Sequence, residues 1–412
     1  MPIDMTIAEF QGLRFACRKV AGPVAYCALS IRSGTRDEGI PGGLAHFTEH
    51  LLFKGTVHRT ATSINNRLER LGGELNAYTT KEDTVIHATV LKEDLAKAID
   101  LIIEMVFASV FPEKEIEKER TVILDEINSY KDAPSEQIFD DFEEHLFTGT
   151  ALAMPVLGKT STLKTIRRQH LTDYVQRQYV PERIAITVQG DYSEARIEQM
   201  IHRSLERHCP QLSATRQQHL PTPGIPVQAT PFYKETRRKG YQTHCLMGAP
   251  AYSAYDERRN ALILLTNLLG GPAANSRLNT LLREKNALVY SVDASYNAYR
   301  DIGCFAIYFG CDHDHYQRCV QLVRKELERL CNDPLSDTAL RMAKRQFLGQ
   351  WAISSDHGES QVLSMGKSLL TYGRILNQEE IRHRIETISS KDLQEVAQEI
   401  FQPDRLSQLT YR

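Results

Sequence analysis

The 412-residue sequence lacks long hydrophobic runs and carries almost no net charge. No stretch approaches the roughly 18 apolar residues that a membrane-spanning helix requires, so we expect no such helix in this protein. Its 50 basic and 52 acidic residues give a formal net charge of −2. This balance offers no general electrostatic attraction to nucleic acids or to anionic membranes. We therefore expect neither nucleic acid nor membrane as a partner.

Two further absences concern the cellular compartment. Residues 1–10 contain no basic region followed by an apolar run, so we expect no signal or transit peptide. The eight cysteines form no Cys-x-x-Cys pair, which in a chain of this length favours reduced thiols over a disulfide framework. Both observations predict a cytoplasmic protein, and export by a route without a signal peptide stays an open alternative.

The sequence divides into two halves. Its composition, with 42% hydrophobic and 25% charged residues, is that of a globular protein long enough for two or three domains. A proline-rich polar segment without hydrophobic periodicity separates the halves. We predict an N-terminal domain at residues 1–212, a linker at 213–230 and a C-terminal domain at 231–412. The order of elements is similar in both halves, which indicates an internal duplication.

Hydrophobic periodicity predicts the individual elements. In the first half we expect strands at 13–18 and 24–32, forming a hairpin, and at 74–80, 84–91 and 184–188. The helices expected there are at 44–54, 63–71, 92–107, 112–131, 135–147 and 194–207. In the second half we expect strands at 242–247, 290–297 and 303–310, with helices at 257–269, 276–285, 315–330 and 335–352. This mixture of strands and helix pairs indicates an α+β fold.

One predicted helix carries a pattern of metal-binding residues. His46 and His50 are four residues apart, so their side chains share a face, with Cβ atoms roughly 5–6 Å apart. Two imidazoles in that arrangement can bind one zinc ion. Glu49 borders the same face, where a carboxylate can accept a proton from a water that zinc activates. His-x-x-Glu-His is the inverzincin motif, but such a pattern also arises by chance on a solvated helix, so the motif alone leaves both interpretations open.

A later helix offers two carboxylates on one face. Glu119 and Glu126, in the helix predicted at 112–131, are two turns apart and lie beside apolar residues. A carboxylate next to apolar residues is costly to bury unless a proton, a cation or a metal compensates it. The local sequence alone favours the simpler interpretation, in which both glutamates are solvated.

Taken together, these motifs resemble those of the pitrilysin-type, or insulinase-like, M16 metallopeptidases of the short two-domain type. His46, Glu49 and His50, followed by Glu126, match the zinc-binding motif of this family, and Glu119 matches its supporting glutamate. Further similar segments, at 33–38, 71–79, 275–278 and 282–292, extend the resemblance over roughly residues 10–401. The resemblance implies that two histidines and Glu126 bind one zinc ion per chain and that Glu49 activates water.

The resemblance also implies two substrate-binding elements. Arg283 and Tyr290, in the second half, correspond to residues that contact the peptide near the cleaved bond. An edge strand of the family pairs with the substrate backbone, and it corresponds here to Asn76, Ala77, Tyr78 and Thr79. Without the resemblance, the simpler interpretation is a surface arginine, a half-buried tyrosine and an ordinary strand.

The family fold implies two homologous domains, each a largely antiparallel sheet with helices packed on it, of which only the first binds metal. Family members twice as long carry the zinc site on the first of four domains and the Arg/Tyr element on the fourth. A two-domain chain would obtain the equivalent of the fourth domain by forming a homodimer. We therefore expect a zinc endopeptidase that cleaves peptides or unfolded polypeptides inside an enclosed chamber.

Three alternatives stay open. The chain can be a processing-peptidase-type subunit acting with a partner protein, although no transit peptide is predicted. It can be a non-catalytic assembly subunit, although the zinc motif is complete. It can bind zinc for structure only, although two histidines and one glutamate are the ligand pattern of an open, catalytic site.

Overall fold

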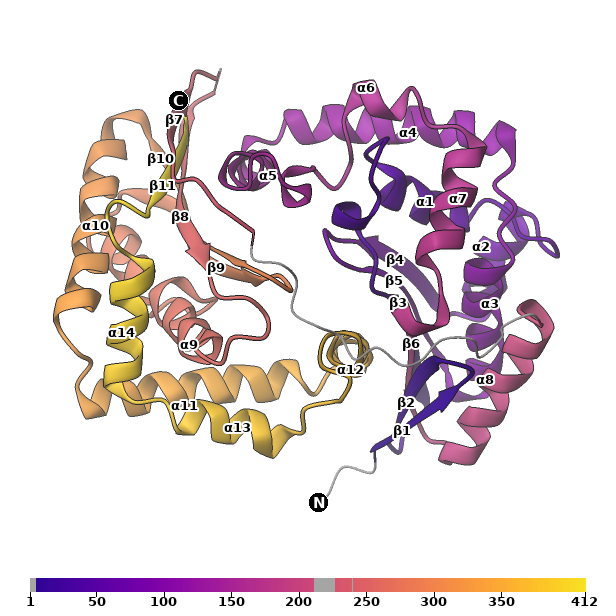
Figure 1. The fold of residues 1–412 in the computed structure, drawn as a ribbon. Helices are drawn as coiled ribbons and strands as arrows, with labels where there is room; N and C mark the ends of the chain where they lie inside the picture. Colours follow the sequence, from indigo (N-terminus) through magenta and orange to yellow (C-terminus); the bar gives the residue numbers. More distant parts are fainter. Residues whose placement is uncertain (1–4, 211–226, 239) are drawn as a thin grey trace. The chain divides into compact units, whose positions relative to one another are not determined.

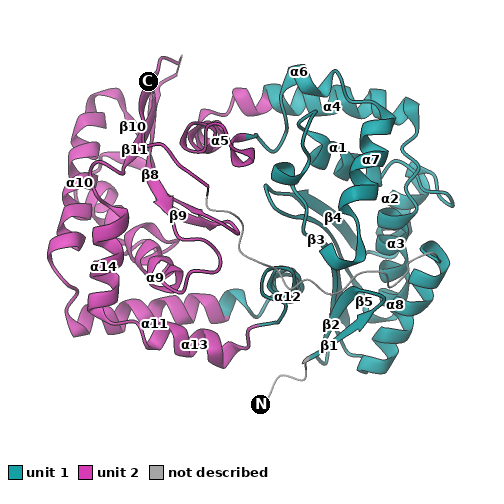
Figure 2. Ribbon diagram, viewed as in Figure 1, with its two compact units in different colours: residues 1–128, 154–222, 353–375 teal, residues 129–153, 223–352, 376–412 magenta. Residues whose placement is uncertain are grey.

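The computed structural model describes residues 5–210, 227–238 and 240–412. They form two compact units, each built around its own sheet (Figures 1 and 2). The first unit comprises residues 1–128, 154–222 and 353–375, and the second comprises 129–153, 223–352 and 376–412. We predicted two contiguous domains, but two segments of the chain belong to the opposite unit. Residues 129–153 of the first half belong to the second unit, and residues 353–375 of the second half belong to the first. Most of the predicted linker lies outside the described residues.

The first unit contains a six-stranded sheet with the order β1-β2-β6-β3-β5-β4. Its strands are β1 Met5–Phe10, β2 Leu13–Lys19, β3 Val24–Ile31, β4 Glu74–Thr79, β5 Thr84–Leu91 and β6 Ile184–Gly190. All neighbours are antiparallel except the parallel pair β2 and β6. The predicted hairpin of β2 and β3 is wrong, because β6, which is buried along its whole length, lies between them. Local periodicity locates a strand but does not identify its neighbour.

Helices cover both faces of this sheet (Figure 1). They are α1 Leu44–Leu52, α2 Ala61–Glu69, α3 Leu95–Phe107, α4 Glu113–Lys131, α6 Thr160–Leu163, α7 Arg168–Gln178, α8 Glu194–His208 and α12 Gly358–Tyr372, with 3-10 turns at Thr35–Asp37, Lys92–Asp94 and Pro181–Arg183. Cys27 and Leu29 of β3 face the main core with α3, whereas Ala28 between them packs with Val362 of α12. Successive strand residues point to opposite faces, so the sheet buries apolar side chains on both sides.

The second unit contains a five-stranded sheet with the order β7-β11-β8-β10-β9. Its strands are β7 Tyr233–Thr236, β8 Gln242–Ala251, β9 Val289–Ala298, β10 Gly303–Asp312 and β11 Ser407–Tyr411. Its helices are α5 Pro134–Leu146, α9 Arg259–Gly270, α10 Tyr316–Asn332, α11 Asp337–Ser354, α13 Gln378–Glu386 and α14 Ser390–Ile400, with 3-10 turns at Ala151–Ala153 and His313–His315. Where we predicted an α-helix at 276–285, the structure has a π-helical segment at Asn279–Glu284.

Both sheets repeat one pattern of strand pairing. Each has a parallel pair, β2 with β6 or β7 with β11, followed by three antiparallel pairs that end at an edge strand, β4 or β9. This shared topology supports the predicted duplication. The two halves of the chain also exchange helices: α5 packs on β8 and β11 of the second unit, and α12 packs on β3 and β6 of the first.

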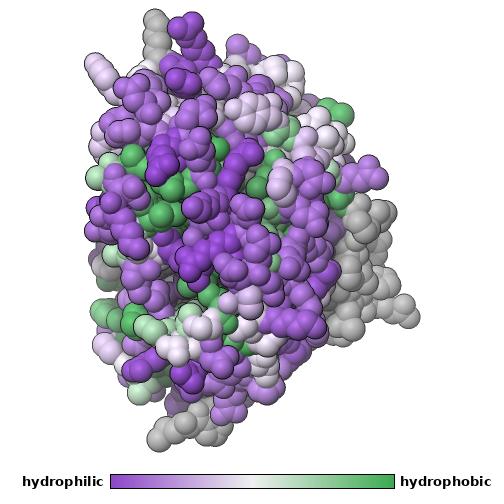
Figure 3. Space-filling view, turned by 90° about the vertical axis from the view of Figure 1, so that its left-hand side faces the viewer, coloured by the Kyte–Doolittle hydropathy of each residue, from purple (hydrophilic) through white to green (hydrophobic). Residues whose placement is uncertain are grey.

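The surface is predominantly polar where Figure 3 shows it, and the apolar residues there lie in small separate patches. Within the described part of the chain, no helix combines the length and the apolar character needed to cross a membrane.

Candidate metal centre

The helix that carries the zinc motif, α1, is fixed at its N-terminus by Glu38. The two carboxylate oxygens of Glu38 accept hydrogen bonds from the backbone N–H groups of Gly43, at 2.6 Å, and Ala45, at 2.8 Å. Burial raises the pKa of Glu38 to about 7, against the effect of these donors, which lower it. A carboxylate at this position satisfies N–H groups that the first helical turn leaves free. Glu38 therefore positions the motif, and it is a site residue that we did not predict.

His46 faces inward from α1. It is buried, and its Nδ1 has no hydrogen-bond partner among the described residues. The centroids of the His46 and His50 rings are 4.6 Å apart. Burial, and secondarily the neighbouring His50, lowers the pKa of His46 to about 3. The ring is therefore neutral at physiological pH, which is the form that binds a metal.

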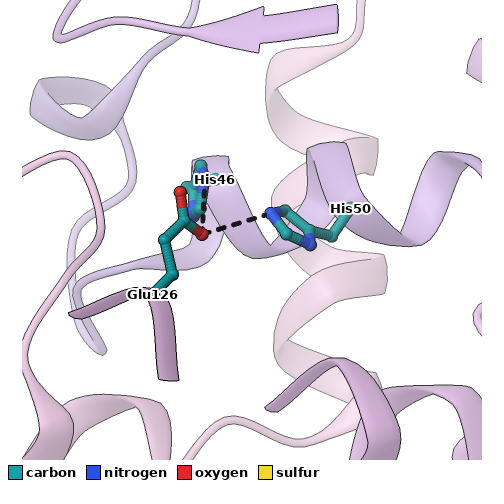
Figure 4. A group of neighbouring side chains, drawn as sticks. All are labelled: His46, His50 and Glu126. Carbon is teal, nitrogen blue, oxygen red and sulfur yellow. Dashed lines mark ion pairs between the residues drawn. The ribbon is translucent and has the colours of Figure 1, made fainter. Parts of the chain in front are cut away.

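Glu126 of α4 brings its carboxylate to the two histidines (Figure 4). Its Oε2 atom lies 3.8 Å from Nε2 of His46 and 3.7 Å from Nε2 of His50. The three ligand atoms lie within 4.8 Å of one another. In a tetrahedral zinc site with bonds of about 2.0–2.2 Å, neighbouring ligand atoms are about 3.4 Å apart. The two separations between the Glu126 oxygen and the histidine nitrogens exceed this spacing by a few tenths of an ångström, so the donor types and their closeness fit a zinc ion.

Glu119, two turns before Glu126 on α4, supports one of these histidines. Its Oε2 lies 3.0 Å from Nδ1 of His50, and its Oε1 lies 2.9 Å from Nζ of Lys54. Because a carboxylate only accepts hydrogen bonds, we infer that Nδ1 of His50 carries the proton and that Nε2 presents its lone pair. Glu119 is buried, so the simpler interpretation of a solvated glutamate does not hold for it.

Glu49 lies beside the ligands on α1 and is held by the edge strand. Its Oε2 accepts a hydrogen bond of 2.6 Å from the hydroxyl of Thr79, the last residue of β4. Burial raises the pKa of Glu49, while Thr79 and His50 oppose this shift. The candidate base and the candidate substrate strand are thus in direct contact.

The predicted substrate strand lies at the edge of its sheet. Strand β4 pairs with β5 on one side, and no other described strand pairs with it. The predicted residues on it are Asn76, Ala77, Tyr78 and Thr79. A strand in this position presents backbone N–H and C=O groups that an extended peptide can pair with.

Arg283 and Tyr290 belong to the second unit. Arg283 comes from the π-helical segment and Tyr290 from the edge strand β9, and both line a cavity of about 500 Å³. The Tyr290 hydroxyl donates a hydrogen bond of 3.0 Å to Asp312. The structure therefore brings the predicted arginine and tyrosine to one cavity.

A second cluster of Asp100, Glu104 and His208 also has ligand atoms close enough for a metal ion. Cations of the protein already compensate its charges. Nη1 of Arg207 lies 2.9 Å from Asp100, and Nε of Arg59 lies 2.8 Å from Glu104. We interpret this cluster as a buried ion network that joins α3 to α8 and to the loop before α2.

Known proteins resemble the chain over most of its length. The family model described as Insulinase (Peptidase family M16) matches residues 14–160, and the model described as Peptidase M16 inactive domain matches 165–347. An uncharacterized zinc protease of Streptomyces coelicolor is 31% identical over 89% of this chain and 80% of its own length. The uncharacterized zinc protease YmxG of Bacillus subtilis is 31% identical over 91% of this chain and 90% of its own length.

Solved structures show the same fold. A protease from Helicobacter pylori superposes with a TM-score of 0.90 at 18% identity, over 100% of this chain and 99% of its own. A peptidase M16 inactive domain from Pseudomonas fluorescens superposes with a TM-score of 0.89 at 18% identity, over 99% and 98%. The predicted α+β fold of two homologous domains is confirmed, and with it the resemblance found in the sequence. The chain belongs to peptidase family M16.

Proposed function

We propose that this protein is a zinc-dependent endopeptidase that cleaves peptides or unfolded polypeptides. Membership of a peptidase family and relatives named zinc proteases support peptidase activity in general. The observation that carries the specific proposal is the convergence of His46, His50 and Glu126 next to the half-buried carboxylate of Glu49. A complete ligand set of this kind argues against a non-catalytic subunit.

In this proposal, His46, His50 and Glu126 hold the zinc ion. When bound, zinc polarises the substrate carbonyl and lowers the pKa of a coordinated water from 15.7 to about 7. His46 needs to lose no proton to bind, because burial keeps its ring neutral. Glu119 holds His50 at Nδ1 and so orients its other nitrogen toward the ion.

Glu49 is the general base. It would accept a proton from the attacking water and deliver it to the amine of the leaving peptide. A carboxylate performs both steps well when its pKa is raised toward the working pH, and burial raises the pKa of Glu49. The Thr79 hydroxyl holds one carboxylate oxygen, which limits the rotation of the base.

The substrate would bind through its backbone. Pairing with the free edge of β4 recognises an extended main chain and few side chains, so it favours unfolded segments. Arg283 and Tyr290 would donate hydrogen bonds to a substrate carbonyl near the cleaved bond. We propose that the site is enclosed in a chamber, so that compact folded proteins are not cleaved.

We further propose that the active particle is a homodimer. The candidate zinc ligands belong to the first unit, and Arg283 and Tyr290 belong to the second. In this arrangement the second unit of one chain completes the site of its partner, with the substrate bound between the two copies.

Digestion of a mixed pool of unfolded peptides, read by mass spectrometry, tests the function. Zinc-loaded protein should cleave the pool, a chelator should stop cleavage, and added zinc should restore it. Glu49→Gln should keep its fold and its zinc but lose about 10²–10⁴-fold in rate. Glu69→Gln, an exposed glutamate on α2, is the matched control and should retain activity. Turnover that survives chelation, or that persists in metal-loaded Glu49→Gln, would contradict the proposal.

A further inference from the structure

The backbone of Thr79 faces away from its own sheet. The N–H group of Thr80 donates a hydrogen bond of 2.7 Å to the carbonyl oxygen of Asp83, so these two residues form a hydrogen-bonded pair of the antiparallel ladder. Such pairs alternate with non-hydrogen-bonded pairs, and the next pair along the ladder is Thr79 with Thr84. The N–H and C=O groups of Thr79 therefore point outward to the free edge of β4, and those of Ala77 do the same.

These outward groups can bind a peptide. No other described strand pairs with this edge of β4, and no loop or turn in the described part of the chain forms a backbone hydrogen bond with Ala77 or Thr79. Tyr78, which lies between them, forms a hydrogen-bonded pair with Val85 and so directs its own backbone groups inward. An extended peptide that adds a strand here would therefore form its backbone hydrogen bonds with Ala77 and Thr79.

The side chain of Thr79 holds the candidate base. Its hydroxyl donates a hydrogen bond of 2.6 Å to Oε2 of Glu49. Non-hydrogen-bonded pairs bring their side chains close together, and the hydroxyl oxygens of Thr79 and Thr84 are 3.5 Å apart. Thr84 is fully buried and donates a hydrogen bond of 2.9 Å to the carbonyl oxygen of Ser33. Thr79 is thus restrained on its inner side, and its outward backbone is the side that a substrate can restrain.

We propose that Thr79 is a positioning residue that couples pairing of the substrate backbone to the orientation of Glu49. The inference rests on the proposed peptidase function. An edge strand is held by hydrogen bonds on one side only, so a peptide bound to Thr79 reduces the motion of its backbone and of the hydroxyl that it carries. A base held more closely in its reactive position speeds the chemical step. Part of the binding energy of the peptide backbone therefore increases the rate of cleavage as well as the affinity.

Peptides with one N-methylated amide test the coupling. The methyl group removes one backbone donor, and it is moved along an otherwise identical peptide, avoiding the cleaved bond. Single-turnover reactions with excess zinc-loaded protein separate the maximal rate from binding. Because the donors of a strand alternate in direction, every second methyl group should weaken binding. At the position that pairs with Thr79, the maximal rate should also fall by about 3–10-fold.

Substitutions determine whether Thr79 transmits this effect. Thr79→Val removes the hydroxyl and keeps the shape of the side chain, so the maximal rate on the unmodified peptide should fall by about 10–100-fold. The methyl group at the sensitive position should then weaken binding alone. Thr79→Ser retains the hydroxyl and should retain the dependence of the rate on methylation. Thr89→Val, the same change opposite the other end of β4, should behave like the wild type.

Two results of these reactions would overturn the coupling. One is a methyl group that lowers the maximal rate by the same factor in wild-type and Thr79→Val protein, because independent effects are additive in free energy. The other is methylation that changes binding but never the maximal rate of the wild type. Zinc content and urea unfolding, measured on each variant, identify any loss of rate that comes from lost metal or lost fold.

Hydrogen exchange resolved to single residues gives a readout that does not depend on catalysis. In zinc-loaded Glu49→Gln protein, a bound peptide should slow exchange of the outward N–H group of Thr79 more than that of Tyr78, which is already paired. Equal protection, or none, would contradict the inference. If the wild type cleaves no peptide in a chelator-sensitive reaction, the proposed function fails and the coupling with it. If it cleaves the peptides but the effects of methylation and Thr79→Val are additive, the coupling alone is wrong.

Discussion

Nδ1 of His50 lies 3.0 Å from Oε2 of Glu119, on the helix that also carries Glu126. One helix, α4, therefore supplies both a candidate ligand and the group that orients another ligand. The geometry of the site depends on how α4 packs against α1, and a change at either carboxylate should be measurable as a change in metal affinity.

Substitution of Glu119 tests the orienting contact. Glu119→Ala leaves both His50 and Lys54 without their acceptor, and loss of such a contact typically weakens metal binding about 10–100-fold. Glu119→Gln keeps an acceptor and should lose less. Competition with a chelator of known affinity measures both. Glu113→Ala, an exposed residue at the start of the same helix, should bind zinc like the wild type, and equal affinity in all four proteins would refute the role of Glu119.

Substitution of Glu126 tests the third ligand. Glu126→Ala removes the one carboxylate that faces both histidines, so bound zinc should fall well below one per chain after dialysis. Elemental analysis of the dialysed protein measures this. A full complement of zinc in the variant would remove Glu126 from the ligand set.

Substitution of Glu104 tests the buried ion network. The side chain of Glu104 is 1% exposed, and it pairs with Arg59 and accepts a hydrogen bond from Thr56. Glu104→Gln leaves Arg59 without its counterion, which should lower the free energy of unfolding by about 3 kcal/mol. Urea unfolding measures the loss. The control Glu93→Gln, at an exposed position, should have almost no effect. If a chelator destabilises the wild type but not Glu126→Ala protein, the loss arises at the zinc motif; if it destabilises both, the network holds a metal.

A mixed dimer tests whether the site is shared between chains. Glu49→Gln and Arg283→Ala should each be nearly inactive as homodimers. When the two are co-expressed with different tags and the mixed dimer is purified, one of its two sites combines an intact Glu49 with an intact Arg283 from the partner. Activity should then return to roughly half of the wild-type value. No recovery would indicate that each chain completes its own site, and a fully active monomer would end the dimer proposal.

The sequence predicted the elements with strong local patterns. The zinc-motif helix and the helix of the two glutamates appear within one or two residues of their expected bounds, because their apolar residues repeat at helical spacing. The features that we missed depend on contacts in the folded structure. Glu38 acts through the backbone N–H groups of Gly43 and Ala45, which no residue pattern reveals.

Helix α12 was missed for a related reason. Gly358 and Gly366 lower its intrinsic helix propensity, and we predicted no helix there. In the structure, a Cβ atom on Gly366 would lie 2.4 Å from Oγ of Ser30 on β3, so the glycine serves a close contact with the sheet. A glycine in the sequence therefore indicates a close contact of this kind only when the residue that it packs against is known.

The exchange of helices has a consequence for biosynthesis. The guanidinium of Arg14 donates a hydrogen bond to the carbonyl oxygen of Leu369 on α12, 355 residues later in the chain. At about 5–20 residues per second, a ribosome needs roughly 20–70 s to travel between these positions. Throughout that interval the nascent sheet lacks the helix that covers one of its faces, and its alanines and Val85 there are open to chaperones or to aggregation. The unit that carries the zinc motif is therefore among the last parts of this protein to mature, even though it is translated first.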